Sequence, residues 1–133
     1  MLIATITALI LIFGGGTDAA SVKKNVLAMQ DMVKQHIADE ERQTQVSDLL
    51  TEMVEELDGF EKRAVELQKG IFDVDKVYGS TAEDFRAVFK KINRNWDETQ
   101  RRMTDLRFKM RDLMKRDEWN AVFADLRKVQ EKG

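Results

Sequence analysis

Two stretches decide the fold expected for this chain: residues 46–78, VSDLLTEMVEELDGFEKRAVELQKGIFDVDKVY, and residues 85–113, FRAVFKKINRNWDETQRRMTDLRFKMRDL. In both, apolar or small side chains recur in alternating steps of four and three residues, the spacing of heptad a and d positions. The first set is Val46, Leu50, Met53, Leu57, Phe60, Ala64, Leu67, Ile71, Val74 and Tyr78, and the second is Phe85, Phe89, Ile92, Trp96, Thr99, Met103, Leu106, Met110 and Leu113. Each set, called a seam below, predicts one long helix.

The two seams match each other in reverse order. Facing residues of an antiparallel helix pair have numbers that add to a constant, and nine pairs, from Val74/Phe85 to Val46/Leu113, add to 159 or 160. The bulky Trp96 then faces the small Ala64, as interdigitating layers require. The sequence therefore predicts an all-α fold, a long antiparallel coiled-coil helical hairpin.

Turn chemistry and charge support the same pairing. Gly79 is able to adopt the left-handed conformation that ends a helix, and Ser80 to Glu83 read as a capping box that begins the next. Residues 39–66 hold ten acidic and three basic side chains, whereas residues 86–116 hold eleven basic and four acidic ones. We expect arms of about 21–78 and 81–131, with the turn at 78–81.

The terminal segments have helical stripes of their own, from Val22 to Ile37 and from Trp119 to Val129. Ile37/Val122, Val33/Leu126 and Met29/Val129 add to 158 or 159, so the hairpin is expected to run its full length, with arms of about 80 to 90 Å. Residue 21 would then lie at the end opposite the turn. The alternative is a short C-terminal helix, residues 118–131, that folds back.

The N-terminus is the second strong signal. Residues 1–13, MLIATITALILIF, are uncharged and mostly apolar, and Gly14, Gly15 and Gly16 follow. Thirteen apolar residues are short for a membrane span, and the missing basic residue weakens a signal peptide. We interpret residues 1–20 as an apolar anchor or signal segment, with membrane contact through residues 1–16, and residues 21–133 as the helical domain. Cleavage after Ala19 and a buried soluble helix are the alternatives.

The orientation of such an anchor is ambiguous. Lys23 and Lys24 follow the apolar run, which by charge alone would leave the domain in the cytoplasm. The junction after residue 13 nevertheless resembles that of an exported protein. We expect an inner-membrane protein with a single N-terminal anchor and a periplasmic helical domain, or, if cleaved, a soluble periplasmic protein.

No stretch of the sequence carries recognisable catalytic chemistry. Cysteine is absent, and the glycines at 14–16 lack the spacing and the lysine of a phosphate loop. His36 has Asp39 and Glu40 at i+3 and i+4, but no second histidine completes a metal site. A net charge of −2 argues against nucleic acid. We expect no enzymatic activity, cofactor, metal or small-molecule substrate.

Two sets of residues are candidates for protein contacts. The first is the hairpin tip: Val77, Tyr78, Gly79, Ser80 and Thr81. The second is apolar but flanks the seams, where two helices cannot bury it: Leu49, Val54, Val65, Phe72, Val88 and Phe108, together with Val77 and Met114. An exposed apolar stripe marks an interaction surface, so we expect a homo-oligomer or a larger membrane-protein assembly.

Three functions are compatible with these features. The first hypothesis is a non-enzymatic membrane-anchored coiled-coil subunit, a structural, scaffold or assembly component of a bacterial membrane or envelope complex. The second is an exported periplasmic helical chaperone or stress-binding protein. The third is a phage lysis-type coiled coil that bridges the envelope. Shape alone does not separate them.

Overall fold

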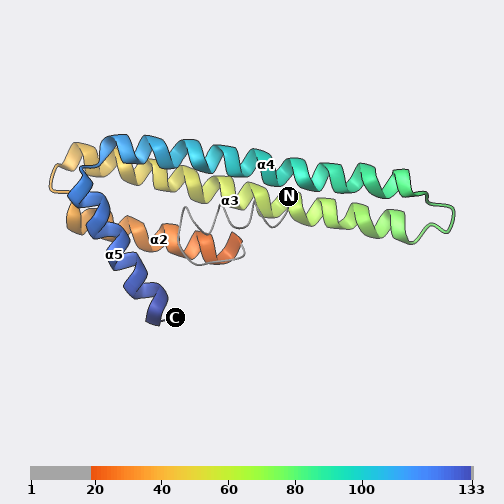
Figure 1. Ribbon diagram of the computed structural model, residues 1–133, viewed down its shortest axis with the longest axis horizontal. Coiled ribbons are helices and arrows are strands. Elements are labelled where there is room, and N and C mark those ends of the chain that lie inside the picture. The colour runs from red at the N-terminus through yellow and green to blue at the C-terminus, as the bar shows by residue number, and fades with distance from the viewer. Residues whose placement is uncertain (1–18, 133) are drawn as a thin grey trace.

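The computed structural model describes residues 19–132, and this part of the chain is all-helical (Figure 1). Its helices are α2 (Ala19–His36), α3 (Glu40–Asp75), α4 (Ala82–Leu113) and α5 (Arg116–Lys132). The all-α class is therefore confirmed. The apolar run at 1–13 and the glycines after it lie outside the described residues. Within residues 19–132, none of the helices combines the length and apolar character that a bilayer crossing requires.

Helices α3 and α4 lie side by side and antiparallel along the long axis of the molecule (Figure 1). The Phe60 and Trp96 rings meet edge to face at 4.6 Å, and Arg102 binds Glu56 across the two helices at 3.1 Å. Seam residues are buried in the half of this pair that lies away from the turn: Val46, Leu50, Met53, Leu57, Phe60, Thr99, Met103, Leu106 and Met110. With 36 residues, α3 is about 54 Å long.

The connection between α3 and α4 differs in detail from the expected turn. Thr81, not Ser80, is the N-cap of α4, and the capping box closes between Thr81 and Asp84 instead of Glu83. Gly79 does not adopt a left-handed conformation. Lys76 ends α3 in right-handed geometry, and its backbone N–H donates to Phe72 O. The turn therefore needs no glycine-specific backbone conformation.

The expected continuous first arm, residues 21–78, is wrong. The chain leaves helical geometry at residues 37–39, and α2 folds back to pack antiparallel on α3. Asp39 caps the N-terminus of α3, while the Gln43 amide donates to Lys34 O and Ile37 O at the end of α2. The polar residues Asp39 and Gln43 thus satisfy the backbone groups of two helix ends. From the sequence pattern alone, such polar residues are equally compatible with a skip within one continuous helix.

The fold-back also overturns the expected reach. Lys23 binds Asp58 at 2.6 Å, and Gln30 binds Thr51 at 3.1 Å. The residue numbers of each pair add to 81, which places Ala19 opposite residue 62, about halfway along the hairpin. The arms are therefore not 80 to 90 Å long, and residue 21 does not lie at the end opposite the turn. The N-terminus of α2 points toward the turn.

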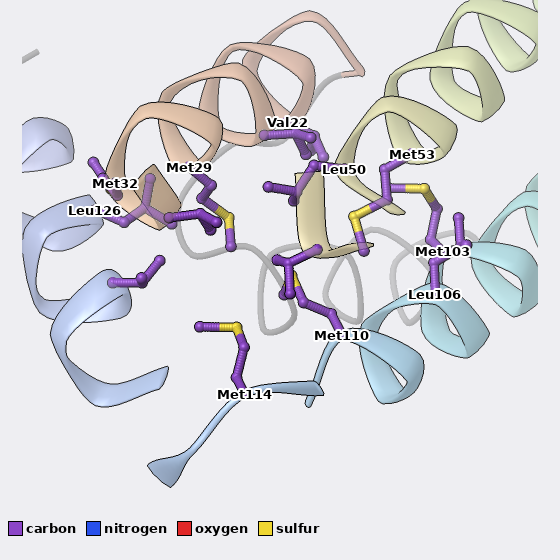
Figure 2. Close-up of a cluster of buried hydrophobic side chains, with 14 of the residues drawn as sticks. Val22, Met29, Met32, Leu50, Met53, Met103, Leu106, Met110, Met114 and Leu126 are labelled. Atoms are coloured by element: carbon purple, nitrogen blue, oxygen red, sulfur yellow. The ribbon is translucent and has the colours of Figure 1, made fainter. Parts of the chain in front are cut away.

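Helix α5 is a separate helix that packs on α2, as in the alternative with a C-terminal helix that folds back (Figure 1). Ile37, Val33, Val122 and Leu126 are all buried in one core cluster. Val129 is 42% exposed, so the expected Met29/Val129 layer is not enclosed. Figure 2 shows that methionines from three helices fill this core: Met29 and Met32 of α2, Met53 of α3, Met103 and Met110 of α4, and Met114 just after it.

An ion pair joins the three helix ends at the base of the hairpin. Arg42 donates to Glu118 through both terminal nitrogens, at 2.7 and 2.9 Å, and Arg42 Nη1 also donates to Leu113 O at 3.1 Å. The Lys115 backbone N–H donates to the same carboxylate at 2.8 Å. Glu118 is only 9% exposed. Two-pronged guanidinium–carboxylate pairs fix orientation as well as distance, so this pair sets how α5 leaves α4.

The ion pair makes stability depend on acid. Hydrogen bonds from Arg42 lower the pKa of Glu118 to about 2, against the opposing effect of burial. Because the folded-state pKa lies below the ordinary value of 4.5, the stabilisation is complete above about pH 5 and is lost as pH falls toward 2. We expect the unfolding free energy to decrease across this interval, by at most about 3 kcal/mol from Glu118, as measured by urea unfolding at several pH values.

The variant Glu118→Gln tests the same junction. It keeps the shape of the side chain but removes the charge that Arg42 binds, so we expect a loss of roughly 1 to 3 kcal/mol at neutral pH. Its stability should also fall less steeply between pH 4 and 2 than that of the parent chain. An unchanged acid profile would show that another carboxylate causes the dependence. Glu83→Gln, at an exposed ion pair with Arg86, is the matched control.

Candidate interaction surface

The hairpin has two unequal halves. Helix α2 covers the half next to the base, while residues 61–94, called the distal arm below, extend beyond it to the turn (Figure 1). None of residues 61–94 is buried, including the seam residues Leu67, Ile71 and Phe85. Two helices alone shield only one side of each seam, and full burial needs a third element. The distal arm is thus the least enclosed part of the described chain.

A polar cluster marks the boundary between the halves. Asn95 is 6% exposed, donates to Phe60 O at 3.3 Å and accepts from Arg63 Nε at 2.7 Å. Arg63 also donates to the buried Thr99 hydroxyl at 3.4 Å. We expected Trp96, not Asn95, on the seam, but Trp96 is only half-buried against Phe60. A sequence signal existed, because Asn95 precedes Thr99 by four residues and so shares its helix face.

The hairpin tip is a short and well-bonded connection. Ser80 Oγ donates to Val74 O at 2.6 Å, and Ser80 N donates to Val77 O at 3.0 Å. Val77 is half-exposed, and Tyr78 is fully exposed. These hydrogen bonds fix the connection, which also contains Gly79 and Thr81. The Tyr78 ring makes no buried contact. An ordered tip with an exposed aromatic ring is a suitable contact point.

The apolar residues that flank the seams do not form one stripe. Leu49 and Val54 are partly buried against the core, and Met114 lies within it. Val88 is half-buried and faces Gly70: a Cβ atom added at Gly70 would lie 3.8 Å from Val88 Cγ1. Phe108 is 42% exposed but lies beneath the guanidinium groups of Arg107 and Arg111, at 5.1 and 4.8 Å. Of this set, Val65, Phe72 and Val77 are largely open to solvent in the distal arm, and Val77 belongs to the tip.

Val65 and Phe72 share a face with Phe89, a seam residue that the structure leaves open. The three are 53%, 64% and 49% exposed. On α3, Asp58 binds α2 through Lys23, and Val65 and Phe72 follow it at intervals of seven residues. On α4, Phe89 lies seven residues before Trp96, which packs against the core. These three side chains, called the distal face below, therefore continue the side of the hairpin that α2 covers.

The opposite side of the distal arm carries charged side chains. A groove of about 500 Å³ runs between α3 and α4 there, lined by Lys62, Arg63, Glu66, Leu67, Lys91, Arg94, Asn95 and Glu98. Its charged side chains are of both signs, and Arg63 is held by Asn95 and Thr99. The groove contrasts with the distal face, whose three large side chains carry no charge.

The only histidine has a structural contact. His36 Nε2 lies 2.6 Å from Asp125 Oδ2, which joins α2 to α5 and lowers the pKa of Asp125. The expected neighbours Asp39 and Glu40 are not on its helix face, because α2 ends at His36. Among residues 19–132, no group of histidine and carboxylate side chains is placed to hold a metal ion.

Comparison of the chain with models of protein families, with curated proteins and with solved structures finds no match in any of the three.

A pair of phenylalanine substitutions separates the enclosed half of the hairpin from the open half. Phe60→Ala removes a side chain that is 7% exposed, and we expect a loss of about 3 to 5 kcal/mol. Phe72→Ala, in the same helix, should change stability by less than about 0.5 kcal/mol, because its ring is mostly in water. Thermal and urea unfolding measure both. A comparable loss in the two variants would mean that something covers Phe72 in the folded protein.

Proposed function

We propose that this protein is a non-enzymatic, membrane-anchored coiled-coil subunit with a structural, scaffold or assembly role in a bacterial membrane or envelope complex. The observation that carries the proposal is the exposed distal arm. Helices α2 and α5 are used to complete one core, and the outer part of the hairpin, residues 61–94, is left available for another molecule. A chain that needed only to fold would gain from enclosing Phe72 and Phe89.

The membrane attachment is supported by the sequence before α2. Residues 1–13 are uncharged and predominantly apolar, and only residues 14–18 separate them from Ala19. In this proposal the segment is held in the inner membrane, and residues 21–133 lie on its periplasmic side. The tip formed by Val77 and Tyr78 and the distal face are the surfaces offered to a larger assembly or to a second copy.

Vesicle flotation tests the attachment. We expect the full-length protein to float with liposomes and to stay bound in high salt, because apolar insertion is insensitive to ionic screening. Leu9→Asp combined with Ile10→Asp should abolish flotation, since each charge at a bilayer centre costs about 3 kcal/mol. Leu27→Asp, at an exposed position of α2, is the control. Flotation of the doubly charged variant would contradict an anchor at residues 1–13.

A pull-down in mild detergent, followed by intact-mass measurement, tests the assembly role. We expect full-length protein that retains Met1 and co-purifies with larger membrane proteins in a defined ratio. A mass that starts after Ala19 would instead indicate a cleaved and exported protein. Recovery of the intact chain alone, at the mass of a monomer, would contradict the subunit proposal.

A second candidate function, a periplasmic helical chaperone or stress-binding protein, is favoured by one observation. Val65, Phe72 and Phe89 expose apolar surface on a face with no covering helix among the described residues. Such a face would bind unfolded clients. Suppression of the aggregation of a reduced model substrate at less than equal molar ratio would favour this function, and its loss in Phe72→Ser would assign it to the distal face.

A further inference from the structure

We infer that the distal face lies on an anionic lipid bilayer, so that the hairpin leans onto the membrane instead of projecting from it. The inference rests on the proposed membrane attachment and adds a second contact to it. It names the surface (Val65, Phe72 and Phe89, with Tyr78 at the tip) and the chemistry of what it meets, acyl chains beneath negatively charged head groups.

The path of the chain supports this contact. The pairing of α2 with α3 places Ala19 opposite residue 62, and α2 points from there toward the turn. Five residues, 14–18, separate Ala19 from the apolar run, and five extended residues span at most about 17 Å. A bilayer that holds residues 1–13 therefore lies close to the start of the distal arm. Val65 is only about 5 Å further along the helix axis.

The side of the hairpin on which α2 lies also supports the contact. Helix α2 lies on the same side of the hairpin as the distal face, because Asp58, Val65 and Phe72 follow one another along α3 and Asp58 binds Lys23. The N-terminus of α2 thus lies on the side of the distal face and not on the side of the charged groove. If the hairpin tilts slightly, with its tip toward the bilayer, both the N-terminus of α2 and the distal face reach the bilayer surface.

The charge of the side chains beside the distal face supports the contact as well. On α3, Lys69 and Lys76 lie seven residues apart, and on α4, Arg86 and Lys90 flank Phe89. The apolar face therefore has a basic edge on both helices, the arrangement of helices that lie in a membrane interface. Long lysine stems follow apolar surface while their ammonium groups reach the head groups. Residues 61–94 hold eight bases and six acids, whereas the rest of the chain holds fourteen and eighteen.

The basic edges are available for phosphate. Lys69, Lys76 and Arg86 pair with Glu66, Asp73 and Glu83 of their own helices at 3.2, 3.3 and 2.8 Å. All six side chains are at least 66% exposed, and such surface pairs hold their partners weakly. An anionic bilayer supplies many competing oxygens at once.

The same edges argue against two other occupants. A second copy of this chain, packed face to face, brings basic edges close to basic edges, which disfavours the contact. Residues 1–13 carry no charged side chain to pair with either edge. An anionic bilayer matches the apolar centre and both edges.

Site-specific fluorescence tests this contact, and the absence of native cysteine makes single labels clean. Full-length Phe72→Cys carries an environment-sensitive dye, and Glu66→Cys, on the groove side of the same helix, is the matched control. Vesicles contain phosphatidylglycerol and brominated phosphatidylcholine, whose bromine quenches the dye only within the acyl region. We expect quenching at position 72 to exceed that at position 66 about threefold or more, as for an interfacial helix face.

Charge variants give a second readout. Lys69→Gln with Lys76→Gln, Arg86→Gln and Lys90→Gln should lower quenching at position 72 while flotation persists through residues 1–13. Lys91→Gln, on the groove side, should leave quenching unchanged. Vesicles of brominated phosphatidylcholine alone should reproduce the effect of the first set. Equal effects of the first set and of Lys91→Gln would overturn the assignment of the basic edges.

The remaining outcomes are distinguishable. Flotation with equal, weak quenching at both positions overturns the inference and leaves the anchor intact. Loss of flotation overturns the anchor and this inference with it. A dye at position 72 that is already shielded before vesicles are added also overturns the inference. If that shielding is lost on dilution, a second copy covers the face, and if it persists, residues 1–13 do.

Discussion

The packing of α2 against the base half of the α3–α4 hairpin is the contact on which the other features depend. It gives the seam of α3 and α4 the third helix that full burial requires, and it creates the surface on which α5 packs. Because α2 has only 18 residues and begins opposite residue 62, it encloses half of the hairpin and leaves the rest open. The division into a closed core and an open arm follows directly.

Polar side chains define where the closed core ends. At the base, Arg42 and Glu118 hold α5 against the ends of α3 and α4, and at the other limit Asn95 and Thr99 are buried in the seam and bound by the exposed Arg63. Buried polar groups must be paired, so Glu118, Asn95 and Thr99 each accept one geometry and exclude others. In a core filled by flexible methionines, such pairs supply specificity that methionine does not supply.

The direction of α2 changes the meaning of the hairpin. A continuous arm from residue 21 would have separated the apolar segment from the turn by the whole length of the molecule. The fold-back instead brings the end of α2 to the middle of the hairpin, on the side where Val65, Phe72 and Phe89 are exposed. In the proposed membrane-bound state, the anchor and the distal face therefore act on the same side, and the tip approaches the bilayer.

The sequence by itself determined the helical class and the two heptad stretches around which α3 and α4 form, because heptad spacing over nine or ten layers is a long, local and repeated signal. It also identified Val65 and Phe72 as apolar residues that two helices do not bury. The tertiary structure alone decided that residues 37–39 are a turn, that Asn95 is more deeply buried than its neighbour Trp96, and that Leu49, Val54 and Met114 are covered. The reason is that a polar interruption such as residues 38–45 fits a kink or a reversal equally well. Contacts remote in sequence, among them Lys23–Asp58 and Arg42–Glu118, select between them.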